Sequence, residues 1–330
     1  MSVPYLRPVA IPTPLTTLPD PNVIWMFQIV RSWEYPQKAD VGLVGIPFDG
    51  AVVTGRQGAR YGPKAVRDAF YANSTYSLEL DVDLSSLNIV DCGDVEVDLM
   101  DAVETYKRTE AVLTYIFECG IIPLIIGGDH SLTSPCIRAL CRLLKGKKIG
   151  IIDFDSHHDC RVGLKGPQSG VWLREILEIE GKPIRGENII QIGIHGFRYS
   201  LVYRDYVKKN NIRVFTPKDV REKGMETVIK EALEIASNGT DAIYVSVDID
   251  CLDMAFAPGC AACSPGGLTT SDLITGIIEV AKHPLTRVID VMEIAPTLDV
   301  NNMTVKVGSE VLINFLCGLL LRNARAFERC

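Results

Sequence analysis

The sequence predicts an α/β fold in which helices cover both faces of a parallel β-sheet. Short runs rich in Val, Ile and Leu alternate with longer amphipathic stretches along most of the chain. The runs are almost continuously apolar, which is typical of strands that are buried on both faces. No linker rich in Ser and Gly, block of charge or internal repeat interrupts this alternation. We therefore expect one α/β domain of larger than average size.

The same patterns assign the elements in chain order. Eight apolar runs are predicted to be strands: 41–47, 87–91, 121–126, 148–153, 188–194, 212–215, 242–247 and 286–291. Five amphipathic stretches between them are predicted to be helices: 101–119, 134–144, 173–180, 226–237 and 271–282. A final stretch, residues 306–327, is apolar on all sides of its middle and should pack as a buried helix.

The first 35 residues differ from the rest of the chain in composition. They are rich in Pro and include the aromatic residues Trp25, Phe27 and Trp33. We expect residues 1–35 to form an extension that wraps the surface or a neighbouring subunit. Residues 36–330 should form the single domain.

Composition and charge exclude several classes of protein. Of the 330 residues 47% are hydrophobic, and 34 basic against 41 acidic side chains give a net charge of −7. A disordered chain would have fewer apolar residues and a larger net charge. No apolar run reaches the roughly 18 residues of a membrane span, and no tract of Lys and Arg indicates a nucleic acid partner. We therefore expect a soluble protein that binds neither a membrane nor a nucleic acid.

The ten cysteines occur without a recognisable secretory signal, so we expect reduced thiols and a cytoplasmic protein. Only Cys260 and Cys263 lie close together in the sequence. A single pair of this kind is a weak signal for zinc or redox chemistry, and packed free thiols are the simpler interpretation.

Acidic residues and histidines gather at the ends of four predicted strands. In chain order they are Asp129 and His130, then Asp155, His157, His158 and Asp159, then Asp248 and Asp250, and finally Glu293. The carboxyl ends of the strands are where open α/β sheets place their ligand sites. A single acid at such a place usually caps a helix, but capping does not explain the whole set.

The spacing of these residues brings six of them together, because residues two apart point to the same side of an extended chain. The six are His130, Asp155, His157, Asp159, Asp248 and Asp250. Four carboxylates at one point repel each other unless cations neutralise them. Oxygen and imidazole ligands without thiolates favour Mn²⁺, with Ni²⁺, Co²⁺ or Zn²⁺ as alternatives. Six ligands are too many for one ion with an open position, so we predict two metal ions.

The same spacing rule separates the two adjacent histidines. It places His158 on the opposite side of the chain from His157, facing the flank of the sheet or the wall of the pocket. A structural role is therefore the main interpretation of His158. The alternative is proton transfer, for which an imidazole is suited.

Three segments that contain these residues resemble the metal-binding signatures of the ureohydrolases. They are Gly127-Gly128-Asp129-His130-Ser131, Asp155-Ser156-His157-His158-Asp159 and Ser246-Val247-Asp248-Ile249-Asp250-Cys251-Leu252-Asp253. Arginase, agmatinase, guanidinobutyrase and formiminoglutamase belong to this family. Segments 45–49, 55–63, 257–259 and 266–269 match the family as well, so the resemblance runs from residue 41 to about residue 300.

The resemblance implies a three-layer αβα sandwich around an eight-stranded parallel sheet, with a binuclear manganese centre. It implies one ion held by His130, Asp155, Asp159 and Asp248, and a second held by His157, Asp155, Asp248 and Asp250. It also implies a homo-oligomer, because members of the family commonly form trimers or hexamers.

A reaction follows from the same resemblance. The ions supply a bridging hydroxide, which attacks the planar carbon of a linear amidine or guanidine compound. Glu293 matches the acid that pairs with this cationic group. Asp159 is placed to take the proton of the nucleophile and to pass it to the departing nitrogen.

The sequence departs from the family pattern around the substrate. Ser169 stands where arginases and agmatinases have a His, and Arg161 follows the second signature, as in formiminoglutamases. Arg161, Ser169 and Arg174 are therefore candidates for contact with the substrate, and each Arg is a candidate for binding a carboxylate. For each Arg the alternative is a surface ion pair. Segments 55–63 and 193–196 look more like those of agmatinases.

These features predict a formiminoglutamase, which releases formamide. The alternative is an agmatinase or another guanidine hydrolase, which releases urea. A non-catalytic scaffold subunit is less consistent with the sequence, because all six ligand positions and Glu293 are filled and buried carboxylates are costly without a metal.

Overall fold

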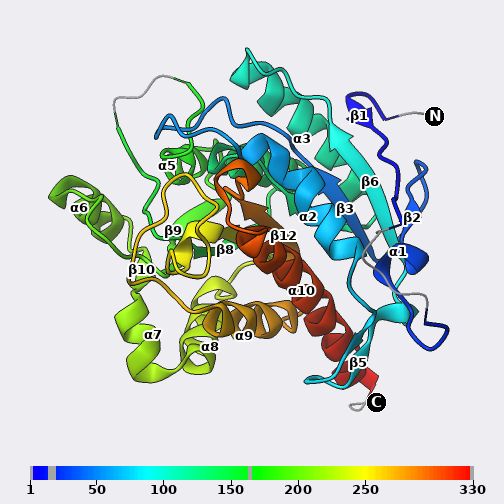
Figure 1. Cartoon of the computed structure of the whole chain (residues 1–330). Helices are drawn as coiled ribbons and strands as arrows, with labels where there is room; N and C mark the ends of the chain where they lie inside the picture. Colours follow the sequence, from blue (N-terminus) through cyan, green and yellow to red (C-terminus); the bar gives the residue numbers. More distant parts are fainter. Residues whose placement is uncertain (1–2, 14–19, 163–165, 328–330) are drawn as a thin grey trace.

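The structure, a computed structural model, describes residues 3–13, 20–162 and 166–327 (Figure 1). Eight parallel strands form its central sheet in the order β6-β3-β7-β12-β11-β8-β9-β10. They are β3 (Val41–Gly45), β6 (Ile89–Val95), β7 (Ile122–Ile126), β8 (Ile149–Phe154), β9 (Ile184–Ile192), β10 (Arg213–Phe215), β11 (Ala242–Asp248) and β12 (Thr286–Met292). Each overlaps one predicted strand, because continuous apolar runs identify strands buried on both faces.

Helices cover both faces of this sheet and complete the predicted αβα sandwich (Figure 1). One face carries α2 (Gly62–Tyr71), α7 (Pro217–Lys223), α8 (Met225–Ala236), α9 (Thr270–Ala281) and α10 (Met303–Phe327). The other face carries α3 (Ala102–Glu118), α4 (Thr133–Leu143), α5 (Trp172–Leu177) and α6 (Leu201–Lys209). Each layer of helices shares a separate apolar core with its face of the sheet.

Within the described residues, α10 is the one helix that is long and apolar enough to cross a membrane. Its segment Met303–Arg322 has a mean hydropathy of 1.6, and 67% of the segment is buried in the protein. The helix packs against α2 and α9. Such burial is typical of a core helix, in agreement with the buried helix predicted for residues 306–327.

The sheet has ten strands rather than the eight predicted, and both additional strands come from the N-terminal segment. Strand β1 (Leu6–Arg7) pairs antiparallel with β6, and β2 (Arg31–Ser32) pairs with β6 in parallel. Each has two residues, which is too short for a strand periodicity to appear in the sequence. Both bind the backbone of β6, one of the two outer strands of the eight parallel strands.

The remaining unpredicted elements are short or polar. Helices α2 and α7 begin with a Pro in the first turn, and α6 buries only Val207. The four-residue helix α1 (Met26–Ile29) and a hairpin of β4 (Tyr76–Ser77) with β5 (Val82–Asp83) complete the described elements other than 3₁₀ turns. Of these segments only α2 has a clear apolar face, formed by Val66, Phe70 and Tyr71, and sequence reasoning missed it.

The carboxyl ends of β7, β12, β11 and β8 lie next to one another in the middle of the sheet. From β8 the chain continues outwards to β9 and β10 and then returns to β11, on the other side of β8. The loops on either side of such a switch in strand order diverge and leave room for a ligand. The acids and histidines singled out in the sequence follow these four strands.

Candidate metal centre and active site

His130 is positioned by the tight turn that follows β7. A Cβ atom at Gly128 would lie 1.6 Å from the carbonyl oxygen of Phe48, so only glycine fits there. Asp129 caps the 3₁₀ turn His130–Leu132, because its Oδ1 accepts the N–H of Ser131 at 3.1 Å. Its Oδ2 accepts the N–H of Ala51 at 2.9 Å. Asp129 therefore joins the turn after β7 to the loop that contains Ala51. The imidazole of His130 is the group that reaches the acidic cluster.

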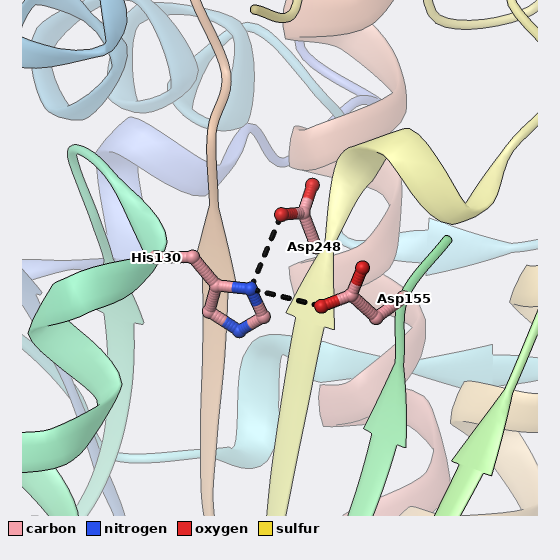
Figure 2. A group of neighbouring side chains, drawn as sticks. All are labelled: His130, Asp155 and Asp248. Carbon is pink, nitrogen blue, oxygen red and sulfur yellow. Dashed lines mark ion pairs between the residues drawn. The ribbon is translucent and has the colours of Figure 1, made fainter. Parts of the chain in front are cut away.

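Three carboxylates surround the His130 ring, and Figure 2 shows two of them, those of Asp155 and Asp248. Its Nδ1 lies 3.2 Å from Asp155 Oδ2, 3.1 Å from Asp248 Oδ2 and 3.4 Å from Asp159 Oδ2. Asp155 follows β8, and Asp248 ends β11. Asp159 has a φ of +42°, a left-handed conformation that is uncommon outside glycine and often found at functional sites.

A second group lies next to the first and shares Asp155 with it. The Nδ1 of His157 lies 3.1 Å from Asp250 Oδ2 and 3.6 Å from Asp155 Oδ1. The structure thus brings all six predicted ligands into two adjacent groups, with Asp155 in both. The nitrogen and oxygen atoms of His130, Asp155 and Asp248, and those of Asp155, His157 and Asp250, are close enough for each set to hold one ion.

These residues fit divalent metal ions. His130 Nδ1 and Asp155 Oδ2 are buried and have no hydrogen-bond partner, although buried polar atoms are nearly always satisfied. Burial would lower the pKa of His130, but the carboxylates around it hold that pKa well above its usual range. Burial and the charges of Asp250 and Asp155 raise the pKa of Asp248. A cluster with this excess of negative charge is stabilised by cations.

A hydrogen-bonded chain behind His130 sets the state of its ring. His130 Nε2 lies 3.0 Å from Ser246 Oγ, and that hydroxyl donates to Asp290 Oδ1 at 2.7 Å. Asp290 Oδ2 accepts the hydroxyls of Thr133 and Tyr244. Because the Ser246 proton points to Asp290, its oxygen accepts the Nε2 proton of His130. Nδ1 is then the nitrogen that faces the carboxylates and would bind an ion, which would displace its proton.

His158 lies outside the cluster. Its Nδ1 is 2.7 Å from Gln191 Oε1, and Gln191 donates from Nε2 to Asp153 Oδ2 at 2.9 Å. The His158 ring packs beside Tyr199, with 5.2 Å between the ring centroids. Burial lowers the pKa of His158. This is the orientation that the alternation of side chains predicts.

Glu293 directs one carboxylate oxygen into the site. Its φ is +64°, and its N–H bonds the carbonyl oxygen of Gly128 at 2.8 Å. Oε1 accepts the N–H of His130 at 3.0 Å, whereas Oε2 is buried without a partner. Burial and the carboxylates of Asp248 and Asp129 raise the pKa of Glu293. Both conditions favour a cationic group of a substrate beside Oε2.

A cavity opens above the two groups, and five of the six ligands line it together with Glu293. Arg161 and Ser169 also line the cavity. The hydroxyl oxygen of Ser169 accepts the N–H of Val53 at 3.3 Å, and the Ser169 N–H bonds the carbonyl oxygen of Ala51. Ser169 therefore joins two loops of the cavity rim.

Arg174 is not among the residues of this cavity. It donates from Nη2 to the carbonyl oxygen of Cys160 at 2.8 Å and from Nε to that of Arg161 at 3.2 Å. Its guanidinium lies 3.7 Å from the ring centroid of Tyr206. Arg174 thus fixes the backbone that carries Arg161, a role that the sequence does not show.

Cys260 and Cys263 lie at the rim of the same cavity, which Ala261 and Ala262 between them line. Cys260 is buried and Cys263 is half-buried. A hydrogen bond between the two thiols lowers the pKa of Cys263 to about 6.

Sequence reasoning missed three residues around the site. Ser246 and Asp290 are neighbours only because β11 and β12 pair in that register. Arg198 lines the cavity from the loop after β9. Of these three residues only Ser246 lies within a metal-binding signature, so it alone could have been singled out from the sequence.

The fold and this cluster define a class of protein, metal-dependent hydrolases built on a parallel sheet between two layers of helices. The model of the arginase family matches residues 39–318, and the chain belongs to that family. The predicted ureohydrolase membership is thereby confirmed. So is the predicted class of enzyme, a metal-dependent hydrolase of amidine or guanidine compounds.

Known relatives and structures cover nearly the whole chain. A formimidoylglutamase of Halalkalibacterium halodurans is 37% identical over 92% of this chain and 95% of its own length. A guanidinopropionase of Pseudomonas aeruginosa is 32% identical over 91% and 93%. The crystal structure of formimidoylglutamase from Bacillus subtilis superposes with a TM-score of 0.87 at 33% identity, covering 93% and 95% of the two chains. That of Trypanosoma cruzi formiminoglutamase with Mn²⁺ has a TM-score of 0.78 at 27% identity, covering 86% and 94%.

Proposed function

We propose that this protein is a formiminoglutamase, which hydrolyses N-formimino-L-glutamate to L-glutamate and formamide. The observation that carries the proposal is the presence of two opposite, unpaired charges in one cavity. Glu293 has a buried oxygen without a partner, and Arg161 makes no ion pair within the described residues. A substrate with a cationic amidine at one end and a carboxylate at the other matches this pair. The formimidoylglutamases among the relatives support the same substrate.

The six ligands suit two divalent ions, for which we propose Mn²⁺, with Ni²⁺ as the alternative. One ion would be held by His130, Asp155, Asp159 and Asp248, and the other by His157, Asp155, Asp248 and Asp250. Once bound, such ions would neutralise the four carboxylates and would supply a water molecule of lowered pKa as the nucleophile near neutral pH.

The side chains of the protein supply the rest of the chemistry. Glu293 Oε2 accepts an N–H of the formimino group and orients its planar carbon. Asp159, 3.4 Å from the His130 ring, takes the proton of the attacking water and delivers it to the α-nitrogen of glutamate. A C–O bond forms and the bond from carbon to this nitrogen breaks. Arg161 holds a carboxylate of the substrate, and the hydroxyl proton of Ser169 is available to the same group.

The second candidate is a guanidine hydrolase that releases urea. The guanidinopropionase relative and the agmatinase-like segments 55–63 and 193–196 favour it. Agmatine itself fits the cavity less well, because its second cation would lie near Arg161. A non-catalytic scaffold is disfavoured by the unsatisfied buried atoms of His130 and Asp155, which only a bound ion would satisfy.

A direct test is to incubate the purified protein with Mn²⁺ or Ni²⁺ and one substrate at a time. The substrates are formiminoglutamate, guanidinobutyrate, guanidine, arginine and agmatine, and both formamide and urea are measured. We expect formamide from formiminoglutamate and little urea from the others. Faster release of urea from any guanidine would overturn the assignment in favour of that compound.

We further propose that the protein is a cytoplasmic homo-oligomer, a trimer or hexamer, in which residues 1–35 extend the domain 36–330. The side chains of Phe197, Leu201 and Val202 support an interface, because they are 104%, 68% and 62% exposed although apolar. Light scattering after size-exclusion chromatography tests the oligomeric state, and a monomeric mass would refute it.

A further inference from the structure

The loop between β9 and α6 is fixed in place although it lies at the surface. His195 Nδ1 lies 2.7 Å from the carbonyl oxygen of Gly193, and Nε2 lies 3.1 Å from Ser264 Oγ. The hydroxyl of Tyr199 donates to the carbonyl oxygen of His195 at 2.6 Å. The Tyr199 ring packs beside both His157 and His158. The loop is thus attached to the metal ligands on one side and to the rim of the cavity on the other.

Arg198 is carried by this loop and lines the cavity above the metal ligands together with Arg161. The two arginines also line a smaller neighbouring pocket with Tyr199. Arg198 is itself exposed to solvent at the mouth.

Other arginines near the cavity already have partners. Arg56 donates to the carbonyl oxygen of Ala261 at 3.2 Å, and Arg60 pairs with Asp49. Arg174 donates to two backbone carbonyl oxygens. In the parts of the chain that the structure describes, Arg161 and Arg198 make no ion pair, so two positive charges at the mouth are available to a ligand.

These charges match the proposed substrate one to one. Formiminoglutamate has a cationic formimino group, for which Glu293 is available, and two carboxylates, for which there are two arginines. With two divalent ions bound, the four aspartates of the centre are neutralised and do not cancel the arginines. A guanidino acid such as guanidinopropionate has one carboxylate, and agmatine has none. The number of carboxylates therefore separates the candidate substrates.

We propose that Arg198 is a specificity-determining residue, which binds the second carboxylate of a dicarboxylate substrate while Arg161 binds the first. This inference rests on the proposed function. The planar guanidinium is suited to a bidentate contact with a carboxylate, which fixes the substrate tail and so places its formimino carbon over the metal ligands. Arg198 acts on recognition and takes no part in proton transfer.

The test compares Arg198→Ala with the native Mn²⁺-loaded enzyme on three substrates. These are N-formimino-L-glutamate and two analogues, each of which lacks one of its carboxylates. We expect the substitution to raise the KM for formiminoglutamate and lower kcat/KM by about 10- to 100-fold, with kcat nearly unchanged. On the analogue that lacks the carboxylate bound by Arg198, the substitution should have almost no effect. Arg198→Lys should restore part of the loss.

Arg204→Ala is the matched control. It removes another exposed arginine from the neighbouring helix α6, where Arg204 pairs with Asp205 at 2.7 Å. Its kinetic constants should equal those of the native protein. Equal losses on all three substrates, or a KM for formiminoglutamate that Arg198→Ala leaves unchanged, would overturn the inference.

A binding measurement separates this inference from the proposed reaction. Glutarate has the two carboxylates of glutamate without a group to hydrolyse, and calorimetry reports its Kd for the Mn²⁺-loaded protein. We expect Arg198→Ala to raise that Kd about tenfold or more, and Arg204→Ala to leave it unchanged. Equal Kd values for native protein and Arg198→Ala would refute the dicarboxylate site. Absence of formamide release alongside an Arg198-dependent Kd would refute only the reaction.

Discussion

Arg67 and His130 each stand at the centre of a buried cluster of carboxylates, and the two clusters differ in how their charges are satisfied. Arg67, on α2, lies 2.9 Å from Asp91 and 2.6 Å from Asp94, both on β6, and donates to the carbonyl oxygen of Gly93. Asp94 is also 3.5 Å from Arg7. Two carboxylates thus meet two guanidinium groups.

The cluster around His130 has no such balance. Four aspartates and Glu293 meet there, and among the described residues no Lys or Arg forms an ion pair with any of them. Within the described residues the imidazoles of His130 and His157 are the cationic partners of these five carboxylates, so the cluster keeps an excess of negative charge.

The difference distinguishes a structural cluster from a ligand site. A buried charge that finds its partner within the protein fixes the packing of two elements, here α2 on β6. A buried charge without a partner is destabilising and is retained where a ligand supplies the partner. The balance of charge, rather than burial or the number of acids, identifies the functional cluster.

The largest effect is expected from Asp248→Asn. A neutral amide cannot neutralise two dications, so the variant should lose most of its bound metal and more than about 1000-fold in activity. Elemental analysis and the formamide assay measure both. The fold should survive, because the substitution removes one of several repelling carboxylates. Retention of the full metal content would show that Asp248 does not bridge the ions.

Arg67→Met should instead lower the stability of the fold. It leaves Asp91 and Asp94 as buried charges without their main partner, which costs about 3–5 kcal/mol of unfolding free energy. Urea denaturation measures the loss, and added Mn²⁺ should not reverse it. Arg7→Met is the control, since the Arg7 side chain is 63% exposed and its pair is worth less than about 1 kcal/mol. Similar losses for both variants would remove the contrast between the clusters.

Glu293→Gln tests the one acid of the unbalanced cluster that is assigned to the substrate. It should keep both metals and lower kcat/KM by about 30- to 1000-fold, as the loss of a charge-assisted pair of roughly 2–4 kcal/mol implies. Metal content separates this result from that of Asp248→Asn. Unchanged kinetics would mean that the cationic end of the substrate binds elsewhere.

The interior strands and the cluster of predicted metal ligands were accessible to sequence reasoning for related reasons. Continuous apolar runs identify strands such as β8, and a spacing of two residues places Asp155 and His157 on one side of the chain after it. Both signals are local. The strands β1 and β2 carry no comparable signal, because two residues define no periodicity.

Contacts between distant segments were not accessible. Asp290 supports His130 through Ser246 because β11 and β12 pair in one register. Arg174 is directed to backbone carbonyls and Arg198 to the cavity, although both are arginines on loops or helices beyond the second signature. The chemical type of a residue indicates what it is able to bind, and only the fold decides what it meets.

The smallest effect is expected from substitution of His158. The neighbouring His157 serves as the comparison. His157 Nδ1 lies 3.1 Å from Asp250 within the cluster, whereas His158 Nδ1 bonds Gln191 outside it. His157→Asn should therefore lose one metal ion, and His158→Asn should retain both and keep activity within a few fold. Elemental analysis compares the variants directly.

Two results for His158→Asn would change the assignment. Loss of a metal would place His158 rather than His157 among the ligands and contradict the side-chain alternation observed after β8. Loss of one limb of the pH–rate profile with both metals retained would instead assign proton transfer to His158, the role that Ser169 cannot fill because its hydroxyl does not titrate near neutral pH. A native-like profile would confine His158 to supporting the loop through Gln191, which donates to Asp153 beneath the cluster. In that case the unbalanced cluster ends at His157, and the polar residues beside it have their partners within the protein, as the charge-balanced groups around Arg67 do.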